Sequence, residues 1–143
     1  MSTKIKPPHV YVANVSEKLG LGVFAIRAFI RNEVIEVAPV FLLEEKFSNL
    51  PIEFKHRTFN WGYLAKSHIS NAIAMGYGSI YNHSDHPNLR YEANTEEKVI
   101  KFIAQRNIDP NEQLTIHYNQ ENDGSEPDKA DWFGKKGIEK HAN

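Results

Sequence analysis

Residues 82–88 of this 143-residue chain read NHSDHPN, and residues 112–118 read EQLTIHY. The first stretch is a dense polar cluster after an apolar segment at 75–80, and Pro87 beside Asn88 is typical of a turn. The second stretch alternates apolar and polar residues, which predicts a β-strand that ends near Tyr118. Taken alone, each stretch has an ordinary structural explanation, a turn and a strand with an aromatic residue at its end.

The histidines in these two stretches raise the question of a metal site. His83 and His86 flank Asp85, and His117 would add a third ligand. The H-E-x-x-H spacing of zinc proteases is absent, however, and histidines on turns are common. The chain has no cysteine, which excludes a thiolate zinc site, a disulfide framework and a cysteine nucleophile. We therefore predict no bound metal.

A glycine-containing run, GLGVFA, occupies residues 20–25. It fits the dinucleotide fingerprint G-x-G-x-x-G/A, which needs a strand before it, a helix after it and an acidic residue about 20 positions later. Residues 26–30 are instead rich in β-branched and aromatic types, Asn32 would end a helix early, and Glu36 comes too soon. A tight turn between two strands is the better interpretation. A dinucleotide-dependent oxidoreductase remains an alternative that rests on the glycines alone.

Most of the chain reads as short strands separated by turn residues. Strands are expected at residues 9–14, 21–25, 34–43, 89–93, 99–104 and 113–118, with a hairpin turn at 94–98. Residues 51–74 mix aromatic and small residues and are expected to hold one or two helices. This pattern predicts a mostly β architecture of folded sheets.

Composition places the chain among ordinary globular proteins, with 41% hydrophobic and 24% charged residues. No apolar run approaches the roughly 18–20 residues that span a bilayer, and the first residues lack an apolar signal core. The net charge of −1 is unlike the basic footprint of nucleic-acid binders. We expect a soluble intracellular protein, in the cytoplasm or nucleus or delivered into a host cell, without direct nucleic-acid or membrane binding.

In this order, the three motifs resemble those of SET domains in protein lysine methyltransferases. Residues 20–25 are similar to the opening motif, residues 82–88 to the N-H-S-x-x-P-N signature, and residues 112–118 to the closing E-x-L-T-x-x-Y signature. The short length and GYGSIY at 76–81 are most similar to the minimal, viral-type SET histone lysine methyltransferases. The resemblance implies a β-clip-like fold with small curved sheets, a few short helices and a C-terminal pseudoknot in which the closing segment tucks beneath a threaded loop.

The same resemblance implies a single SET domain over residues 1–143. Its core would cover about residues 9–118, and residues 119–143 would form an acidic loop and a post-SET-like segment without zinc. The acidic residues Glu121, Asp123, Glu126, Asp128 and Asp131 fit either a solvated loop or a rim that attracts a basic peptide. So small a domain would lack flanking modules to complete its substrate groove. A homodimer is therefore one expected way to complete the groove.

The activity that the resemblance implies is transfer of a methyl group from S-adenosylmethionine to the ε-amine of a lysine in a basic protein, such as a histone tail. Two alternatives accompany it. One is a non-catalytic SET-like module that binds a peptide, and the other is a SET-like enzyme that acts on a small-molecule amine.

Individual residues receive roles from the same resemblance. Tyr118 matches the catalytic tyrosine, whose hydroxyl orients the amine or the methyl group, and Tyr63 would be a second catalytic tyrosine. The residues expected to bind the cofactor are Gly20, Leu21, Gly22, Asn82, His83, Tyr118, Trp132 and Phe133, with hydrogen bonds from the backbone and side chains of the Asn82-His83 pair and an aromatic over the adenine. The expected substrate channel consists of Tyr63, Tyr81, Tyr91 and Ile103, of which Ile103 would control the number of methyl groups.

The chain departs from the family pattern in two places near the signature. Asp85 stands where a cysteine usually follows N-H-S, and Ser79 replaces an arginine that often precedes it. The cysteine-rich zinc module after the domain is missing as well. We therefore expect Trp132 and Phe133, another chain or the substrate itself to close the channel.

Overall fold

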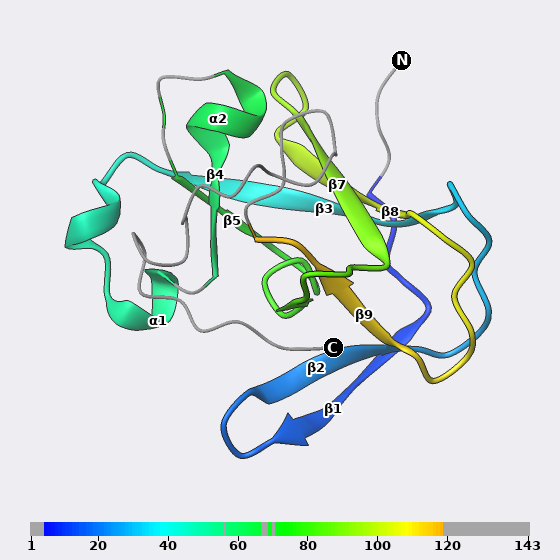
Figure 1. Cartoon of the computed structure of the whole chain (residues 1–143). Coiled ribbons are helices and arrows are strands. Elements are labelled where there is room, and N and C mark those ends of the chain that lie inside the picture. Colours follow the sequence, from blue (N-terminus) through cyan, green and yellow to red (C-terminus); the bar gives the residue numbers. More distant parts are fainter. Residues whose placement is uncertain (1–4, 56, 67–68, 70, 119–143) are drawn as a thin grey trace.

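The computed structural model describes residues 5–55, 57–66, 69 and 71–118, which form two β-sheets and a few short helices (Figure 1). The strands are β1 (Val10–Ser16), β2 (Gly20–Ala25), β3 (Val34–Leu43), β4 (Thr58–Asn60), β5 (Asn71–Ala74), β6 (Asn82–His83), β7 (Leu89–Asn94), β8 (Val99–Ala104) and β9 (Gln113–Ile116). The helices are the 3-10 turn η1 (Phe47–Asn49), α1 (Ile52–Lys55) and α2 (Trp61–Ala65). None of the described helices is long and apolar enough to cross a membrane. The predicted mostly β architecture with few short helices is confirmed.

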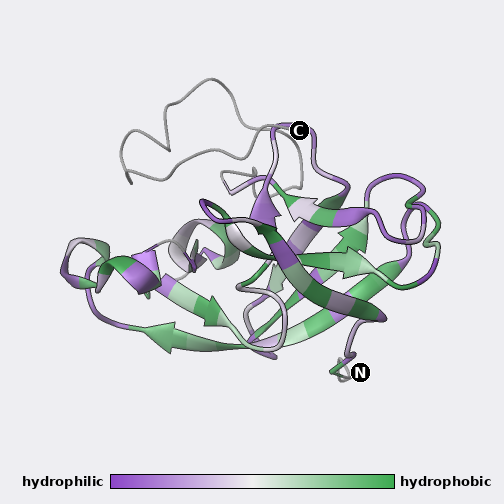
Figure 2. Cartoon of the chain, turned by 90° about the horizontal axis from the view of Figure 1, so that it is seen from below, coloured by the Kyte–Doolittle hydropathy of each residue, from purple (hydrophilic) through white to green (hydrophobic). Residues whose placement is uncertain are grey.

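The larger sheet has the strand order β4-β5-β3-β8-β7, and β3 is its centre. The Val- and Ile-rich sequence of β3 suits a strand that is paired on both sides, and hydrophobic residues follow the strands of this sheet (Figure 2). β7 and β8 form the predicted hairpin, whose turn places Lys98 at φ 54.

An aromatic cluster fills the core on one face of this sheet. Phe102 on β8 has no exposed surface, and its ring centroid lies 4.8 Å from that of Tyr81. The centroids of Phe59 and Tyr91 each lie 6.1 Å from that of Phe102. Burying one such side chain stabilises the fold by about 1.5–3 kcal/mol, so the cluster ties β4, β7 and β8 to the loop before β6.

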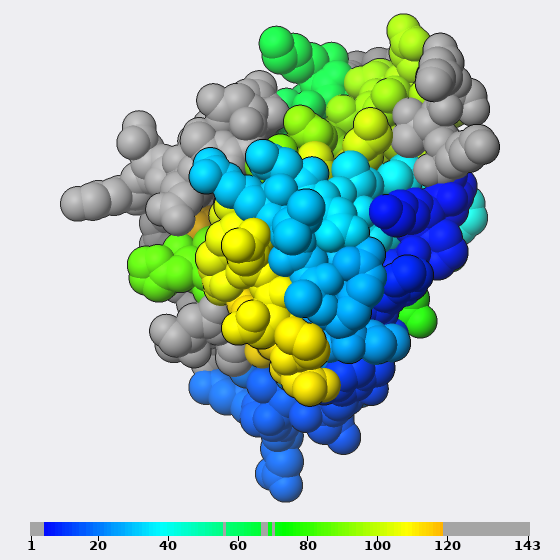
Figure 3. Space-filling view, turned by 90° about the vertical axis from the view of Figure 1, so that its right-hand side faces the viewer, coloured from blue at the N-terminus to red at the C-terminus, as the bar shows by residue number. Residues whose placement is uncertain are grey.

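The smaller sheet has the order β1-β2-β9-β6. β1 and β2 form an antiparallel hairpin that projects from the base of the molecule (blue in Figure 3). Gly20 begins β2 at φ +72, a conformation that glycine adopts without steric cost. β9 pairs antiparallel with β2 and parallel with β6. The closing motif therefore lies between the opening hairpin and the NHSDHPN segment.

The glycine run is part of an antiparallel hairpin, which contradicts the dinucleotide interpretation. No helix follows β2, since residues 26–33 form an irregular segment. This segment packs against residues 104–112 (light blue and yellow in Figure 3), and Phe29 and Ile108 exchange two backbone hydrogen bonds of 2.9 Å. The crossover helix of a βαβ unit is thus missing from this part of the chain.

A buried carboxylate on β3 holds the loop that leads into β6. Glu36 is 2% exposed, and its Oε1 accepts the Tyr81 hydroxyl at 2.6 Å while its Oε2 accepts the Tyr77 amide at 3.0 Å. Gly76, at φ +65, fits here because a Cβ would lie 2.6 Å from Glu36 Oε2. Burial raises the pKa of Glu36, against the opposing effect of these two hydrogen bonds.

Candidate active site

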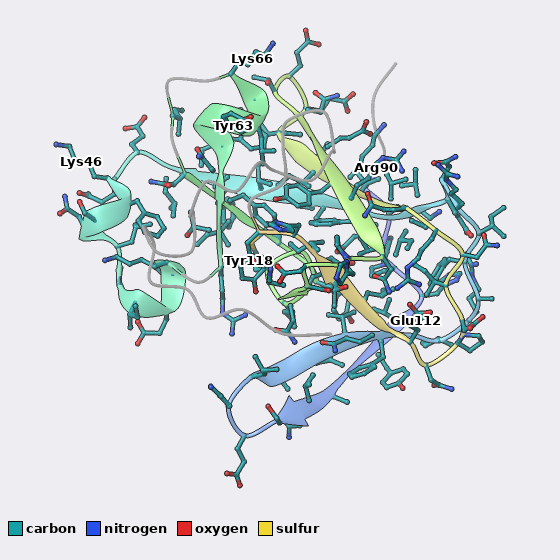
Figure 4. The ribbon with its side chains drawn as sticks, in the orientation of Figure 1. Lys46, Tyr63, Lys66, Arg90, Glu112 and Tyr118 are labelled. Atoms are coloured by element: carbon teal, nitrogen blue, oxygen red, sulfur yellow. The ribbon has the colours of Figure 1, made fainter. Side chains whose placement is uncertain are left out.

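Tyr118 follows β9 and is held at its amide, its carbonyl and its hydroxyl. Its N–H donates to His83 Nδ1 at 3.0 Å, and its hydroxyl donates to the carbonyl oxygen of Tyr81 at 3.3 Å. The hydroxyl of Tyr91 donates to the carbonyl oxygen of His117 at 2.9 Å and lies 3.4 Å from that of Tyr118. Figure 4 shows Tyr118 near the centre of the molecule. These contacts give the phenol a defined orientation, as a positioning role requires.

Burial raises the pKa of the Tyr118 hydroxyl above its ordinary value of 10.0, so the group is protonated at neutral pH. The positive charge of Arg57 opposes this rise in pKa. Arg57 Nη1 is anchored by a hydrogen bond of 2.9 Å to the carbonyl oxygen of Ser79. Arg57, from the segment before β4, thus places its positive charge beside Ser79. At the position of Ser79 the family pattern often has an arginine.

Asn82 joins three segments at one point. Its Nδ2 donates to the carbonyl oxygen of Leu21 on β2 at 3.1 Å and to Gln113 Oε1 on β9 at 2.9 Å. Gly22 leaves room for this junction, because a Cβ there would lie 2.8 Å from Gln113 Oε1 and 3.1 Å from Asn82 Nδ2. The structure therefore brings together Asn82 and the glycine strand with Gly20, as expected for two parts of one binding site.

The imidazole of His83 is 1% exposed and bonds to protein atoms through both nitrogens. Nδ1 accepts the Tyr118 amide, and Nε2 lies 3.0 Å from Asp85 Oδ1. A backbone N–H can only donate, so Nδ1 is the unprotonated nitrogen. Nε2 is then the protonated nitrogen, and it donates its hydrogen to Asp85. The predicted hydrogen bond from this side chain to a cofactor would break one of these bonds. The role of the ring in this geometry is to hold Tyr118.

His83, Asp85 and His117 each present one potential metal-ligand atom, and these atoms lie within 4.8 Å of one another. Coordination through His83 Nε2 would require this nitrogen to lose its proton, while Nδ1 is already facing the amide hydrogen of Tyr118. The ring would have to become an imidazolate. This arrangement favours a hydrogen-bonded cluster over a metal site.

The second asparagine of NHSDHPN clamps the closing motif. Asn88 is 1% exposed, and its Nδ2 donates to the carbonyl oxygen of Gln113 at 2.8 Å and to Glu112 Oε2 at 2.9 Å. Its Oδ1 accepts the Thr115 amide at 2.8 Å. A buried amide left without such partners would cost about 1–3 kcal/mol. In this chain the two signatures satisfy polar groups of each other.

The tyrosines expected to form the channel occupy different environments. Tyr63 lies in the middle of α2, is 45% exposed and lies apart from Tyr118 in Figure 4. Tyr81 and Tyr91 are 1% and 2% exposed, and their hydroxyls bond within the protein. Their geometry favours structural roles beside Tyr118. Trp132 and Phe133, expected over the adenine, lie outside the described residues.

The register of β8 decides which face of the sheet Ile103 occupies. Phe102 pairs with Tyr91 and faces the aromatic core, so its neighbour Ile103 points to the opposite face of the sheet. On that face Ile103 pairs with Arg90 and Val34. Ile103 is therefore separated by the sheet from the face that carries the aromatic cluster, and its control of methyl number stays a prediction.

Three residues around Tyr118 were not predicted from the sequence. Glu36 gave a signal, because it is the only charged residue in the apolar stretch 34–43. Asp85 was visible as the acid between two histidines in the rejected metal site and as a departure from the family pattern. Arg57 gave no signal, since its contact with Ser79 joins residues that are 22 positions apart.

Comparisons with known proteins bear on the family and the fold of the chain. A family model described as the SET domain matches residues 20–119. The chain is 28% identical over 106 residues to the histone-lysine N-methyltransferase, H3 lysine-37 specific, of Schizosaccharomyces pombe, covering 72% of this chain and 69% of that protein. A crystal structure from Plasmodium falciparum, described as that of a candidate histone methyltransferase, matches with a TM-score of 0.62 at 24% identity, over 80% of this chain and 96% of that chain. This last comparison shows a shared fold.

Proposed function

The chain belongs to the SET-domain family, and we propose that it is a protein lysine N-methyltransferase whose catalytic centre lies at Tyr118. The observation that carries the proposal is the convergence of β2, Asn82 and Tyr118 around β9. A binding site for the methyl donor and a group that orients the acceptor are then adjacent, as in-line transfer requires.

The residues around Asn82 fit the amino-acid part of S-adenosylmethionine. Both hydrogens of Asn82 Nδ2 are used within the protein, so a further hydrogen bond to this side chain must be accepted by Oδ1, which suits an ammonium group. At Gly20 on β2, no described atom lies within 4 Å of the position of a Cβ, so a ligand has room to approach the backbone closely there, whereas the same position at Gly22 is filled by protein atoms. When bound, S-adenosylmethionine supplies a methyl group on a cationic sulfur that an amine can displace.

Tyr118 is suited to orient the acceptor amine. Its hydroxyl donates to the carbonyl of Tyr81, and a phenol oxygen can accept a hydrogen bond as well as donate one, so it is suited to accept an N–H of the incoming lysine. Accepting that hydrogen directs the lone pair of the amine away from the tyrosine and toward the methyl group. Alignment of this kind contributes several kcal/mol to the lowering of a barrier.

The lysine must lose its proton before it can react. A lysine of ordinary pKa near 10.4 is about three units too basic at neutral pH, so deprotonation costs about 4 kcal/mol. Nearby positive charge and exclusion of water both lower the pKa of an amine. Arg57 and the buried surroundings of the Tyr118 hydroxyl supply these conditions in this chain.

The names of the relatives support one substrate class. The yeast relative is named for a lysine of histone H3, which supports a histone or another basic protein as the acceptor. A small-molecule amine and a module that binds peptide without turnover are the competing possibilities that the experiment must separate.

Calorimetric titration with S-adenosylmethionine, with a nicotinamide dinucleotide as the control ligand, tests the donor site. Incubation with recombinant histones and the methyl donor, followed by mass spectrometry, tests transfer. We expect saturable binding of S-adenosylmethionine alone and methylated lysine in a histone. Donor binding without transfer to any protein would favour the non-catalytic module or a small-molecule acceptor, and failure to bind the donor would overturn the proposal.

A further inference from the structure

Asp85 lies beside the histidine that holds Tyr118. Its Oδ1 is 3.0 Å from His83 Nε2 and 3.9 Å from His117 Nε2. The two imidazole rings pack edge to face with centroids 4.5 Å apart. The side chain of Asp85 is 49% exposed, whereas that of His83 is 1% exposed, so a partly solvated carboxylate contacts a fully buried ring.

The hydrogen bonds on the two sides of His83 favour the same tautomer. The Tyr118 amide requires a lone pair on Nδ1, and the Asp85 carboxylate requires a proton on Nε2. In histidines, the hydrogen bond made by one nitrogen decides the state of the other. A carboxylate that accepts the Nε2 proton also polarises the ring and strengthens Nδ1 as an acceptor.

We propose that Asp85 is a positioning residue for methyl transfer. By accepting the Nε2 proton of His83, it keeps Nδ1 as the acceptor for the Tyr118 amide and so fixes the direction of the phenol. Asp85 acts through His83 and does not touch the reacting groups. The catalytic part of this inference rests on the proposed function of Tyr118.

The position of Asp85 separates this role from a structural one. Because its side chain is half exposed, truncation leaves no buried cavity, and the fold is expected to survive. A purely structural contact would change stability without changing the amide of Tyr118. The proposal predicts a change at that amide, two hydrogen bonds away from the substituted residue.

The test compares Asp85→Ala and Asp85→Asn in the full chain labelled with ¹⁵N. The readouts are the ring nitrogen shifts of His83, the exchange rate of the Tyr118 amide hydrogen, and kcat and KM for S-adenosylmethionine. In Asp85→Ala we expect the amide to exchange about tenfold faster and kcat to fall by about 10–100-fold, since small misplacements cost such factors. KM for the methyl donor should change by less than about threefold, because Asn82 and β2 are not affected.

Asp85→Asn is the rescue variant. Its side-chain oxygen still accepts the Nε2 proton, so amide exchange, tautomer and kcat should stay close to those of the wild type. The control Glu92→Ala removes an exposed carboxylate on β7 and should leave all readouts unchanged. Unchanged exchange of the Tyr118 amide in Asp85→Ala, or equal impairment of Asp85→Ala and Asp85→Asn, would overturn the proposal.

Failure of the proposed function gives a different result. The tautomer and the amide exchange are measured without turnover. If the wild-type protein transfers no methyl group while Asp85→Ala still speeds the exchange of the Tyr118 amide hydrogen, the link from Asp85 to Tyr118 is confirmed and the assigned activity is wrong.

Discussion

At the scale of single residues, the central feature is the number of separate segments that position Tyr118. Its amide bonds to β6 through His83, its hydroxyl bonds to the carbonyl of Tyr81 before β6, and its carbonyl is near the Tyr91 hydroxyl from β7. A tyrosine at the end of a strand would otherwise keep rotamer freedom. Because folding already fixes the side chain of Tyr118, the entropic cost of ordering it does not recur in each reaction.

Replacement of Tyr118 by phenylalanine tests the assigned role. Loss of the hydroxyl should lower kcat by about 10²–10⁴-fold, as expected for a lost orienting group, with little change in affinity for S-adenosylmethionine. Single-turnover kinetics and calorimetry measure the two quantities. Tyr63→Phe, on the exposed side of α2, is the matched variant and should have the smaller effect. Wild-type-like turnover of Tyr118→Phe would remove this hydroxyl from the mechanism.

At the scale of elements, β9 is the strand on which the site depends. It lies between β2 and β6, and the side chains of Asn82 and Asn88 bond to it from the NHSDHPN segment. β6 is only two residues long and pairs in parallel, so it gains little from strand propensity. Asparagine side chains supply the remaining hydrogen bonds that keep this short ladder together.

Gly22→Ala tests how tightly β2 packs on this junction. The new Cβ would lie 2.5 Å from Val15 Cγ2 and 2.8 Å from Gln113 Oε1, which predicts a loss of about 1–3 kcal/mol in the free energy of unfolding. The same substitution in a Gln113→Ala background should cost less, because one of the clashing groups is gone. Urea denaturation of the four proteins measures the coupling.

Gly20→Ala is the control for this experiment. No atom lies within 4 Å of a Cβ at Gly20, but the residue has φ +72, so we expect a cost of about 1–2 kcal/mol from backbone strain alone. Gln113→Ala should not relieve it. If Gln113→Ala reduced the loss of unfolding free energy equally for Gly20→Ala and Gly22→Ala, the packing explanation for Gly22 would be contradicted.

At the scale of the whole molecule, the two sheets are joined by a buried polar contact as well as by apolar packing. Glu36 on β3 of the larger sheet binds Tyr77 and Tyr81 in the loop that enters β6 of the smaller sheet. Tyr81 in turn offers its carbonyl to the Tyr118 hydroxyl. A charge in the core is costly unless hydrogen bonds compensate it, so this contact makes stability depend on pH.

The sign of that dependence follows from the raised pKa of Glu36. The folded protein holds this proton more tightly than the unfolded chain, whose carboxyl has the ordinary pKa of 4.5. The contribution of Glu36 to stability is therefore greatest below pH 4.5 and falls as the pH rises through the folded pKa. As the pH rises from 4.5 through the folded pKa of Glu36, the wild type should lose unfolding free energy relative to Glu36→Gln. Urea titrations at several pH values measure this difference.

Tyr81→Phe sharpens the same test. Removing the hydroxyl takes away a hydrogen bond that lowers the pKa of Glu36, so the pH window should extend upward, at a cost of about 1 kcal/mol for the lost bond. A difference between wild type and Glu36→Gln that is constant with pH would show that Glu36 titrates alike in the folded and unfolded states.

The sequence alone determined most of the strands and the three motifs of the site. Apolar runs rich in β-branched residues placed β3 and β8 at their observed bounds, since strand propensity is local. The motifs of residues 20–25, 82–88 and 112–118 indicated the family, and they meet at β9. β4 and β5 were missed because they lie in the stretch 51–74 that was expected to hold helices, and β6 was missed because two residues have too little pattern to recognise.

Only the tertiary structure decided how the residues of the site are used. The sequence assigned the His83 ring to the cofactor and Ile103 to the channel, whereas the fold turns the first toward Tyr118 and Asp85 and the second to the far face of β8. Periodicity predicts whether a residue belongs to a strand, but the direction of a side chain and its hydrogen-bond partner depend on segments tens of residues away. For that physical reason the partners of Tyr118 became visible only when β6, β7 and β9 were brought together.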